Sequence, residues 1–338
     1  MEIRIDKKSE LMNIMLYLSD YNNLLKNFDD KHPFNKSTTY GKDIIKHFSK
    51  FKKHKTIQLL NELVNGRFGK NKNTFCYDAP ICLIMQLNED FTYSKLNRYP
   101  FHTRLCRDNR VLEFLDSIPQ FVEDTRYENF FASHKTFYDV LIKEFKKNVD
   151  ETLTDDIGFM YKLKLKNKFV VNLMPTIHQN NYGFSLSKVI YSNIDLPVEN
   201  GTFDIKSMKK WLRWLLFHEF SHSIVNPLSD KYLSELYSPL SDKTISILNR
   251  QAYSNGVCYF NESVIRAMTI LYENYFTKTT KNEEKNIIEE ENRGFVHTRL
   301  LLDKLKEFQS MNISFEEFYP TLQEVFETNV ENINITNL

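Results

Sequence analysis

The sequence predicts an α+β protein that is mostly α-helical. Apolar residues follow a helical period over residues 1–150, the period changes to that of short strands over residues 159–194, and a helical period returns after residue 204. With 338 residues, 41% of them hydrophobic, the chain can bury one large core or two modest ones. We expect a mainly helical region over residues 1–155 and a second region over residues 156–338 that contains the sheet and further helices.

Short elements open the chain. Glu2–Asp6 alternates as a strand does, and Ser9 is a candidate N-cap for a helix over Glu10–Asp20. Asp78 is a candidate N-cap for a later helix, in which Pro80 stands at a position that tolerates proline. The other segments expected to be helical are Gly41–Phe51, Lys55–Val64, Ala79–Leu87 and Arg110–Val149, the last one interrupted near Pro119 and around Asn129–Ser133.

The strand period begins near residue 159. Phe159–Leu165 and Phe169–Met174 flank the polar Lys166-Asn167-Lys168, an arrangement that predicts a β-hairpin. Tyr182–Leu186 and Lys188–Ile194 predict further short strands. We therefore expect a small sheet of about three to five strands.

A strongly apolar helix follows the strands. Asp204 or Ser207 can cap it, and Asn226-Pro227 is expected to end it, because proline disfavours a helical conformation in the preceding residue. Its apolar residues cover nearly the whole circumference, so we expect the helix to be buried. The rest of the chain is expected to comprise an irregular connection over residues 227–256, a helix over Glu262–Phe276, a charged solvated stretch over Thr277–Glu291, and helices over Gly294–Phe308 and Phe315–Val330.

Composition limits the partners. The 45 Lys and Arg residues oppose 44 Asp and Glu residues, and the net charge of +1 gives no general attraction to nucleic acid, so no such partner is expected. The most apolar segment, Trp211–Phe217, is short and contains Arg213, so no membrane span is expected. The charged start MEIRIDKKSE lacks the apolar run of a secretory signal. The cytoplasm is therefore the default location, and a mature exported form stays open.

The clearest chemistry lies in His218-Glu219-Phe220-Ser221-His222. Residues four apart share one face of a helix, so the imidazoles of His218 and His222 can reach one metal ion while Glu219 lies beside them. Burying such polar residues in an apolar helix without a cation would cost several kcal/mol. The pattern predicts a Zn²⁺ site with Glu219 as the general base.

A third ligand must come from elsewhere, because catalytic zinc sites use three protein ligands and leave the fourth position to water. The metzincin pattern is excluded, since Leu228 and Val225 stand where it needs a histidine and a glycine. Asp230 and Glu235 lie in the expected loop, whereas Glu262 begins a helix that is apolar enough to pack against the first. We favour Glu262 as the third ligand over these two alternatives.

Two segments carry a resemblance to a known family: HEFSHSIVNPLSDKY at residues 218–232 and NESVIRA at residues 261–267. They resemble a family of bacterial zinc metallopeptidases of the gluzincin-like zincin type, catalogued as a domain of unknown function, which combines an HEFSH helix with a downstream NE..RA helix. Tyr77–Pro80 and Tyr182-Gly183 are similar as well, so the resemblance covers residues 1–275. It implies a zincin-like catalytic region within residues 156–338, Zn²⁺ as cofactor, and a peptide or protein as substrate.

Arg266 departs from the thermolysin-like pattern, in which an aspartate four residues after the ligand glutamate orients a zinc histidine. Arginine cannot accept a hydrogen bond from an imidazole. We expect Arg266 to orient Glu262 or to bind a substrate carboxylate, with a structural ion pair as the alternative. The candidates for stabilising the oxyanion are His297, Tyr253 and Tyr259.

The sequence thus predicts zinc-dependent hydrolysis of peptide bonds, in which Glu219 takes a proton from a zinc-activated water and passes it to the leaving amine. The strand around Tyr182–Ser187 is a candidate for pairing with an extended peptide. Two alternatives stay open: a zinc hydrolase that acts on a non-peptide amide or ester, and a catalytically silent zincin scaffold that binds a partner.

Overall fold

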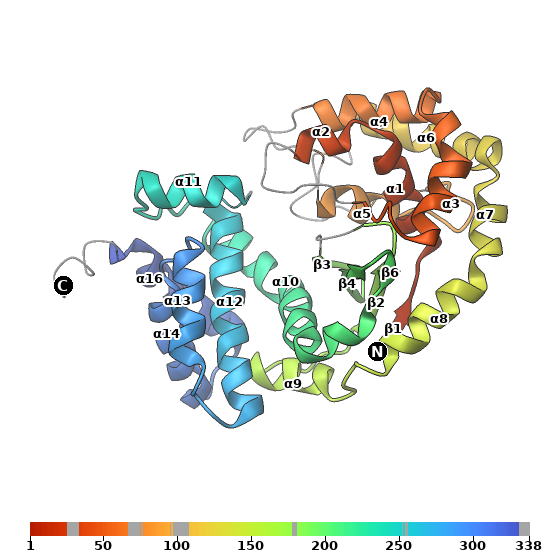
Figure 1. Cartoon of the computed structure of the whole chain (residues 1–338). Helices are drawn as coiled ribbons and strands as arrows, with labels where there is room; N and C mark the ends of the chain where they lie inside the picture. The colour runs from red at the N-terminus through yellow and green to blue at the C-terminus, as the bar shows by residue number, and fades with distance from the viewer. Residues whose placement is uncertain are drawn as a thin grey trace. The chain divides into compact units, whose positions relative to one another are not determined.

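The computed structural model describes residues 1–25, 34–66, 75, 77–94, 96, 108–177, 181–251, 253 and 256–330. These residues are mostly helical and contain a small mixed sheet (Figure 1), so the predicted fold class is confirmed. The chain forms two compact units. The first unit comprises Met1–Asp150 and Asn167–Arg213, and the second comprises Glu151–Lys166 and Trp214–Leu338.

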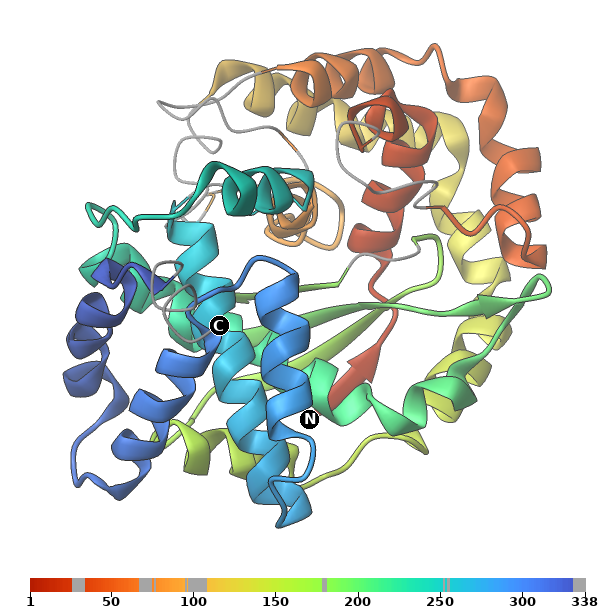
Figure 2. The same ribbon diagram turned by 60° about the vertical axis from the view of Figure 1, so that its left-hand side comes forward.

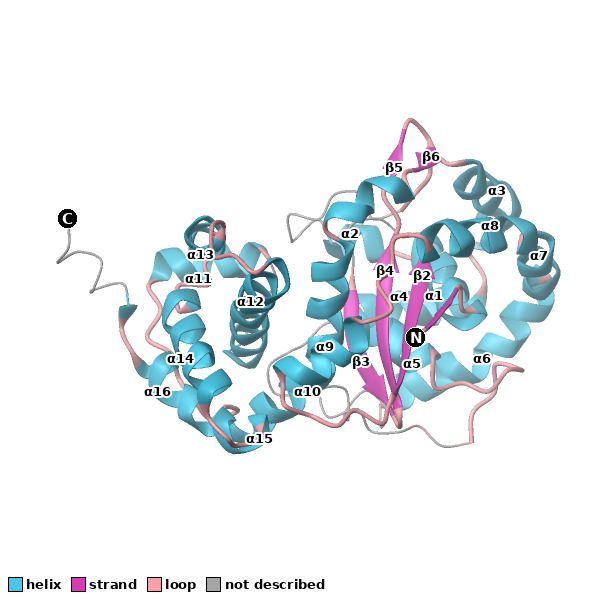
Figure 3. Ribbon diagram, turned by 90° about the horizontal axis from the view of Figure 1, so that it is seen from below, coloured by secondary structure: helices cyan, strands magenta, loops and turns pink. Residues whose placement is uncertain are grey.

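The first unit is organised around a four-stranded sheet (Figure 3). Its strands are β1 (Glu2–Arg4), β2 (Lys168–Met174), β3 (Tyr182–Leu186) and β4 (Val189–Asp195), in the order β1-β2-β4-β3. β2 pairs in parallel with β1 and β4, whereas β3 and β4 are antiparallel. All residues of β2 after Lys168 are buried, as is typical of a central strand covered on both faces. A two-stranded ribbon of β5 (Val198–Glu199) and β6 (Thr202–Phe203) follows.

The predicted hairpin around Lys166-Asn167-Lys168 is wrong. Leu153–Met160 forms helix α9 instead, and β2 finds its partners far away in the sequence. The hairpin of this sheet joins β3 to β4, and its turn residue Ser187 has a φ of 55°, in the left-handed region. An apolar run such as that of β2 fits a parallel strand buried on both faces as well as it fits a hairpin arm, so the pattern alone could not assign its partners.

Helices surround this sheet within the first unit, and α1 packs against β2 while α5 packs against β3. Asp6 caps α1 in place of the predicted Ser9, because its Oδ1 accepts hydrogen bonds from the backbone N–H groups of Lys8 and Ser9. The predicted interruption at Pro119 is also wrong, since α6 continues to Thr125. The helices are α1 (Lys7–Leu18), α2 (Tyr21–Leu25), α3 (Thr39–Phe48), α4 (Lys55–Asn65), α5 (Asp78–Ile84), α6 (Asn109–Thr125), α7 (Tyr127–Ser133), α8 (Lys135–Lys146) and the 3₁₀ helices η1 (Ser49–Phe51) and η4 (Ile205–Lys210).

A buried polar network joins α1 to the sheet. Asn172 in β2 accepts a hydrogen bond from the backbone N–H of Asp6 (2.9 Å) and donates one to Ser9 Oγ (2.7 Å). Its amide also donates to Asn193 Oδ1 in β4 (2.9 Å). These side chains are buried, so a shift of register would leave several polar groups unsatisfied.

Glu10 is a fully buried acid on the same helix. Its Oε1 accepts hydrogen bonds from the hydroxyls of Tyr40 (2.8 Å) and Thr176. Burial raises the pKa of Glu10 from 4.5 to about 7, although the hydrogen bonds from Thr176 and Tyr40 oppose this shift. The folded protein therefore binds this proton more tightly than the unfolded chain does.

The free energy of unfolding should fall as the pH rises from about 4.5 to about 7, because over this range the folded state still binds a proton that the unfolded state has released. The difference between the folded and unfolded pKa values corresponds to a loss of about 3 kcal/mol in the free energy of unfolding. Glu10→Gln keeps the acceptor for Tyr40 and Thr176 but cannot ionise, so its stability relative to the parent should increase between pH 4.5 and pH 8. Chemical denaturation followed by circular dichroism measures this. The exposed Glu123→Gln is the control, and an equal pH dependence in parent and Glu10→Gln would contradict the prediction.

The second unit consists of helices in the residues described. α12 runs the length of this unit and packs against α13 and α14, as Figures 1 and 2 show. The elements are α9 (Leu153–Met160), α10 (Leu212–Tyr232, of which the residues from Trp214 on belong here), α11 (Asp242–Arg250), α12 (Gly256–Thr277), α13 (Glu283–Asn292), α14 (Thr298–Ser310), α15 (Phe315–Phe318), the 3₁₀ helix η5 (Tyr319–Leu322) and α16 (Gln323–Glu327).

α10 differs from its prediction at both ends. Residues 205–210 form the 3₁₀ helix η4, and α10 continues through Pro227 to Tyr232 instead of ending at Asn226-Pro227. Pro227 is exposed, so water can solvate the carbonyl that loses its helical partner there. Burial continues beyond the proline at Ser229 and Leu233. The expected irregular connection is therefore shorter than predicted, and it also contains α11. The expectation of burial around the whole helix is wrong too, since Trp214, Leu215 and Ile224 are only partly buried.

Stacked aromatic rings hold α10 against α12. The ring centroids of Phe217 and Tyr272 are 4.1 Å apart and their planes form an angle of 16°. The centroid of the Phe217 ring is 6.0 Å from that of Tyr161. Trp214 makes an edge contact with Tyr272 at 5.5 Å. Such ring pairs add about 0.5–1.5 kcal/mol each beyond the area they bury. Because Phe217 directly precedes His218, this stack fixes the separation of the two helices next to that histidine.

Among the helices in the described part of the chain, none is long and apolar enough to span a membrane.

Candidate metal centre

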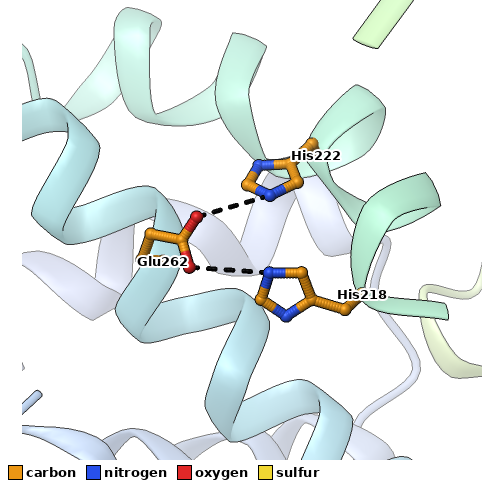
Figure 4. Close-up of side chains that lie close together, drawn as sticks. All are labelled: His218, His222 and Glu262. Atoms are coloured by element: carbon orange, nitrogen blue, oxygen red, sulfur yellow. Dashed lines mark ion pairs between the residues drawn. The ribbon is translucent and has the colours of Figure 1, made fainter. Parts of the chain in front are cut away.

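The three residues predicted as ligands lie together in the second unit (Figure 4). His218 and His222 lie one turn apart on α10, and Glu262 lies on α12. The distance from His218 Nε2 to Glu262 Oε2 is 3.5 Å, and that from His222 Nε2 to Glu262 Oε1 is 3.4 Å. One ligand atom from each of the three residues lies within 4.8 Å of the others. We call these residues the metal-ligand group, because they could hold a metal ion.

The distances within this group suit a tetrahedral ion. Ligand bonds of about 2.0–2.1 Å place neighbouring ligand atoms about 3.4 Å apart. Each imidazole Nε2 lies at about this distance from one oxygen of Glu262, that of His218 from Oε2 and that of His222 from Oε1. Two imidazoles and a carboxylate are also a common donor set for catalytic zinc. Neither Asp230 nor Glu235 belongs to the group: Asp230 is partly exposed and Glu235 is exposed.

Glu262 is held as a carboxylate. Burial alone would raise its pKa, but the charge of Arg266 and the nearby His218 and His222 outweigh burial and hold the pKa of Glu262 well below its usual range. Arg266 Nε and Nη2 lie 3.1 and 3.0 Å from Glu262 Oε2. A permanently ionised carboxylate is the form that a metal ion requires.

Glu219 lies beside this group on α10. Its side chain is buried, and its Oε2 is 4.0 Å from His222 Nε2. The hydroxyl of Tyr253 is close enough for the charges of Glu262 and Glu219 to affect it: the charge of Glu262, followed by burial, raises the pKa of Tyr253 well above its usual value. Tyr253 therefore keeps its proton and can donate a hydrogen bond near the two acids.

A family model described as "Domain of unknown function (DUF4932)" matches residues 1–325. The chain belongs to this family. The match includes both helices that carry the metal-ligand group. Comparison with curated proteins gave no match, and comparison with solved structures gave none. The family description assigns no activity, so the role of this DUF4932 chain has to be argued from its geometry.

Asn226 orients one histidine of the DUF4932 site. Its Oδ1 lies 3.2 Å from His222 Nδ1, one turn further along α10. When His222 donates its Nδ1–H to this oxygen, its Nε2 carries the free lone pair and faces Glu262. The hydrogen bond thus selects the tautomer that a metal ligand needs.

Arg266 lies where the sequence placed it, but its donors are already engaged. Besides Glu262, it contacts Glu290 Oε2 on α13 through Nη1 at 2.8 Å, and its guanidinium stacks on the ring of Phe295 at 4.3 Å. Arg266 is only 9% exposed. These contacts favour the orientation of Glu262 over the binding of a substrate carboxylate.

His297 is buried and uses both ring nitrogens within the chain. Nδ1 lies 2.6 Å from the hydroxyl of Tyr259, and Nε2 lies 3.0 Å from the carbonyl of Thr328, neither of which belongs to the metal-ligand group. His297 and Tyr259 thus engage each other. Of the three residues named for the oxyanion, Tyr253 is the one whose pKa is raised by the charges of Glu262 and Glu219, and its ring lies 5.9 Å from the guanidinium carbon of Arg266.

Sequence reasoning missed two residues that support the ligands, Asn226 and Glu290. Asn226 lies one turn after a predicted ligand, and this spacing could have indicated it. Glu290 lies in a stretch rich in acids that reads as a solvated surface, so no local signal distinguishes it. Only the packing of α13 against α12 reveals its contact with Arg266.

Asn226→Ala should weaken Zn²⁺ binding by about 10–100-fold, because His222 loses the acceptor that fixes its tautomer. Asn226→Asp is the matched control, since it keeps an oxygen at the same place and should bind nearly as tightly as the parent. Competition with a chromophoric chelator measures the affinities. Unchanged affinity in Asn226→Ala would show that His222 does not depend on this hydrogen bond.

Proposed function

We propose that this chain is a zinc-dependent metallopeptidase. The observation that carries the proposal is the position of Glu219. A buried carboxylate that is not one of the three candidate ligands lies 4.0 Å from the ligand histidine His222, on the helix that presents both imidazoles. Three ligands that leave a coordination position open, with a separate acid beside them, form the arrangement of a hydrolytic site.

A zinc ion in this group would polarise a substrate carbonyl and lower the pKa of a bound water toward 7. His218, His222 and Glu262 would hold the ion through Nε2, Nε2 and a carboxylate oxygen. Their donor chemistry and spacing suit zinc, as the distances of 3.4 and 3.5 Å indicate.

Glu219 is the proposed general base. Its carboxylate takes a proton from the attacking water as the new C–O bond forms, and it then gives that proton to the amine nitrogen as the C–N bond breaks. Its burial keeps competing solvent away and strengthens its interaction with nearby charges. One carboxylate can thus serve both transfers without a second acid.

Tyr253 is the proposed donor to the carbonyl oxygen. Its raised pKa keeps the hydroxyl protonated, and its ring lies 5.9 Å from the guanidinium carbon of Arg266, the residue that contacts Glu262. A donor aimed at the oxygen on which negative charge develops stabilises the transition state more than the ground state. His297 is not proposed for this step, because its ring nitrogens bond Tyr259 and Thr328.

Peptides are the proposed substrates because the family resemblance seen in the sequence implies a peptidase, and a zinc site with a glutamate base suits amide hydrolysis. The same groups could hydrolyse a non-peptide amide or an ester. A scaffold that binds a partner without turnover is the third possibility. β3, named as a candidate for pairing with a peptide, is an edge strand of the described sheet in the first unit.

Glu219→Gln should lower kcat/KM by about 10²–10⁴-fold while zinc stays bound, because the amide cannot accept the proton from water. Digestion of a peptide library by the zinc-loaded protein, combined with metal analysis, measures both effects. The exposed Glu235→Gln is the matched control and should behave as the parent does. Equal hydrolysis by parent and Glu219→Gln would refute the mechanism, and the absence of cleavage by a zinc-loaded parent would favour the silent scaffold.

Tyr253→Phe should lower kcat by about 10²-fold with little change in KM, because the lost hydroxyl acts mainly in the transition state. Steady-state kinetics on a peptide identified from the library measures the two constants. Tyr237→Phe alters a tyrosine that is 79% exposed and serves as the control. A rise in KM at constant kcat would instead assign Tyr253 to substrate binding.

A further inference from the structure

The carboxylate of Glu262 offers its two oxygens unequally. Both oxygens face a histidine: Oε1 lies 3.4 Å from His222 Nε2, and Oε2 lies 3.5 Å from His218 Nε2. Only Oε2 is also the target of Arg266, whose Nε and Nη2 lie 3.1 and 3.0 Å from it. Two charge-assisted donors on one oxygen occupy its lone pairs. Oε1 is not among the atoms that Arg266 contacts, so its lone pairs are not shared with the guanidinium.

Glu290 anchors the guanidinium that makes this distinction. Its Oε2 accepts a hydrogen bond from Arg266 Nη1 at 2.8 Å, so that one arginine joins Glu262 on α12 to Glu290 on α13. Phe295 stacks on the guanidinium at 4.3 Å and limits its movement. Burial alone would lower the pKa of Arg266, but the charges of Glu262 and Glu290 together outweigh burial and raise that pKa above its usual value, so the guanidinium stays charged.

We propose that Arg266, anchored by Glu290, reserves Oε2 of Glu262 and thereby makes Glu262 a ligand through Oε1 alone. A carboxylate that binds through both oxygens would add a coordination bond and take up space at the open position. Arg266 therefore preserves the position that the water and the carbonyl need. In this role Arg266 is a positioning residue. The inference rests on the metal site of the proposed function, and not on its substrate.

Cobalt(II) substitution tests the proposal, because four-coordinate Co²⁺ absorbs visible light more strongly than five-coordinate Co²⁺. Arg266→Lys keeps the positive charge but loses the planar fork. We expect its Co²⁺ absorption to fall about twofold or more and its Zn²⁺ affinity to weaken about tenfold. Glu290→Gln keeps the shape of its side chain and removes the anchoring charge, so it should change both quantities in the same direction by less.

Arg293→Gln provides the matched control. Arg293 pairs with the other oxygen of Glu290 at 3.2 Å, and its side chain is 52% exposed. Its loss should leave the cobalt spectrum and the zinc affinity unchanged. The unfolding temperature of the metal-free proteins, measured in parallel, reports the structural contribution of each ion pair.

The outcomes separate two roles. A parent-like spectrum and affinity in Arg266→Lys and Glu290→Gln, with a lower unfolding temperature, would overturn the proposal and leave a structural ion pair. If Arg266→Lys does not fold, the Co²⁺ spectrum and Zn²⁺ affinity of Glu290→Gln decide between the two roles, because this variant retains the contact between Arg266 and Glu262. A parent that binds no Co²⁺ would also overturn the proposal. A parent that binds Co²⁺ as expected but cleaves no peptide would contradict the proposed function alone.

Discussion

The site depends first on the packing of α10 against α12. Both histidines lie on one helix and Glu262 lies on the other, so the distances of 3.4 and 3.5 Å between them exist only if the two helices keep a fixed separation. The ring of Phe217, stacked on Tyr272 at 4.1 Å, provides that constraint next to His218. Rotamers in a close-packed core are restricted, so ring packing here determines where the ligand atoms lie.

Packing at this spacing creates an electrostatic problem, because the buried carboxylates of Glu262 and Glu219 both lie near His222. Glu262 faces Arg266, which in turn faces Glu290, so two acids share one guanidinium. Removing one partner of a buried ion pair lowers the stability of the fold by more than the intact pair contributes to it. A substitution of only one of these three residues is therefore expected to be destabilising. Glu219 also lies near His222, with its Oε2 4.0 Å from His222 Nε2, but Arg266 contacts Glu262 and not Glu219. The carboxylates of Glu262 and Glu219 thus differ in their cationic neighbours, and this difference supports the proposed roles of Glu262 as a ligand and Glu219 as a base.

The fold class and the three members of the metal-ligand group could be predicted because each has a local signal. The helical period identified α4 and α12, and the spacing of His218 and His222 requires only a helix. The partners of β2 could not be predicted, since a run buried on both faces carries no record of its neighbours. The passage of α10 through Pro227 depends on burial that resumes at Ser229, and the role of Glu290 depends on how α13 packs, so neither had a local signal.

The supporting contacts are exchanged relative to the thermolysin-like pattern that the motif resembles. In the thermolysin-like pattern, an acid one turn after the ligand glutamate accepts a hydrogen bond from a zinc-binding histidine. In this chain Arg266 occupies that position, and it donates a hydrogen bond to Glu262. The acceptor for His222 is Asn226, on the same helix as the histidine. The orientation of His222 therefore depends on α10 alone, whereas that of Glu262 depends on α12 and, through Glu290, on α13. A helix whose sequence is typical of a solvated surface, α13, thereby helps to position a member of the metal-ligand group.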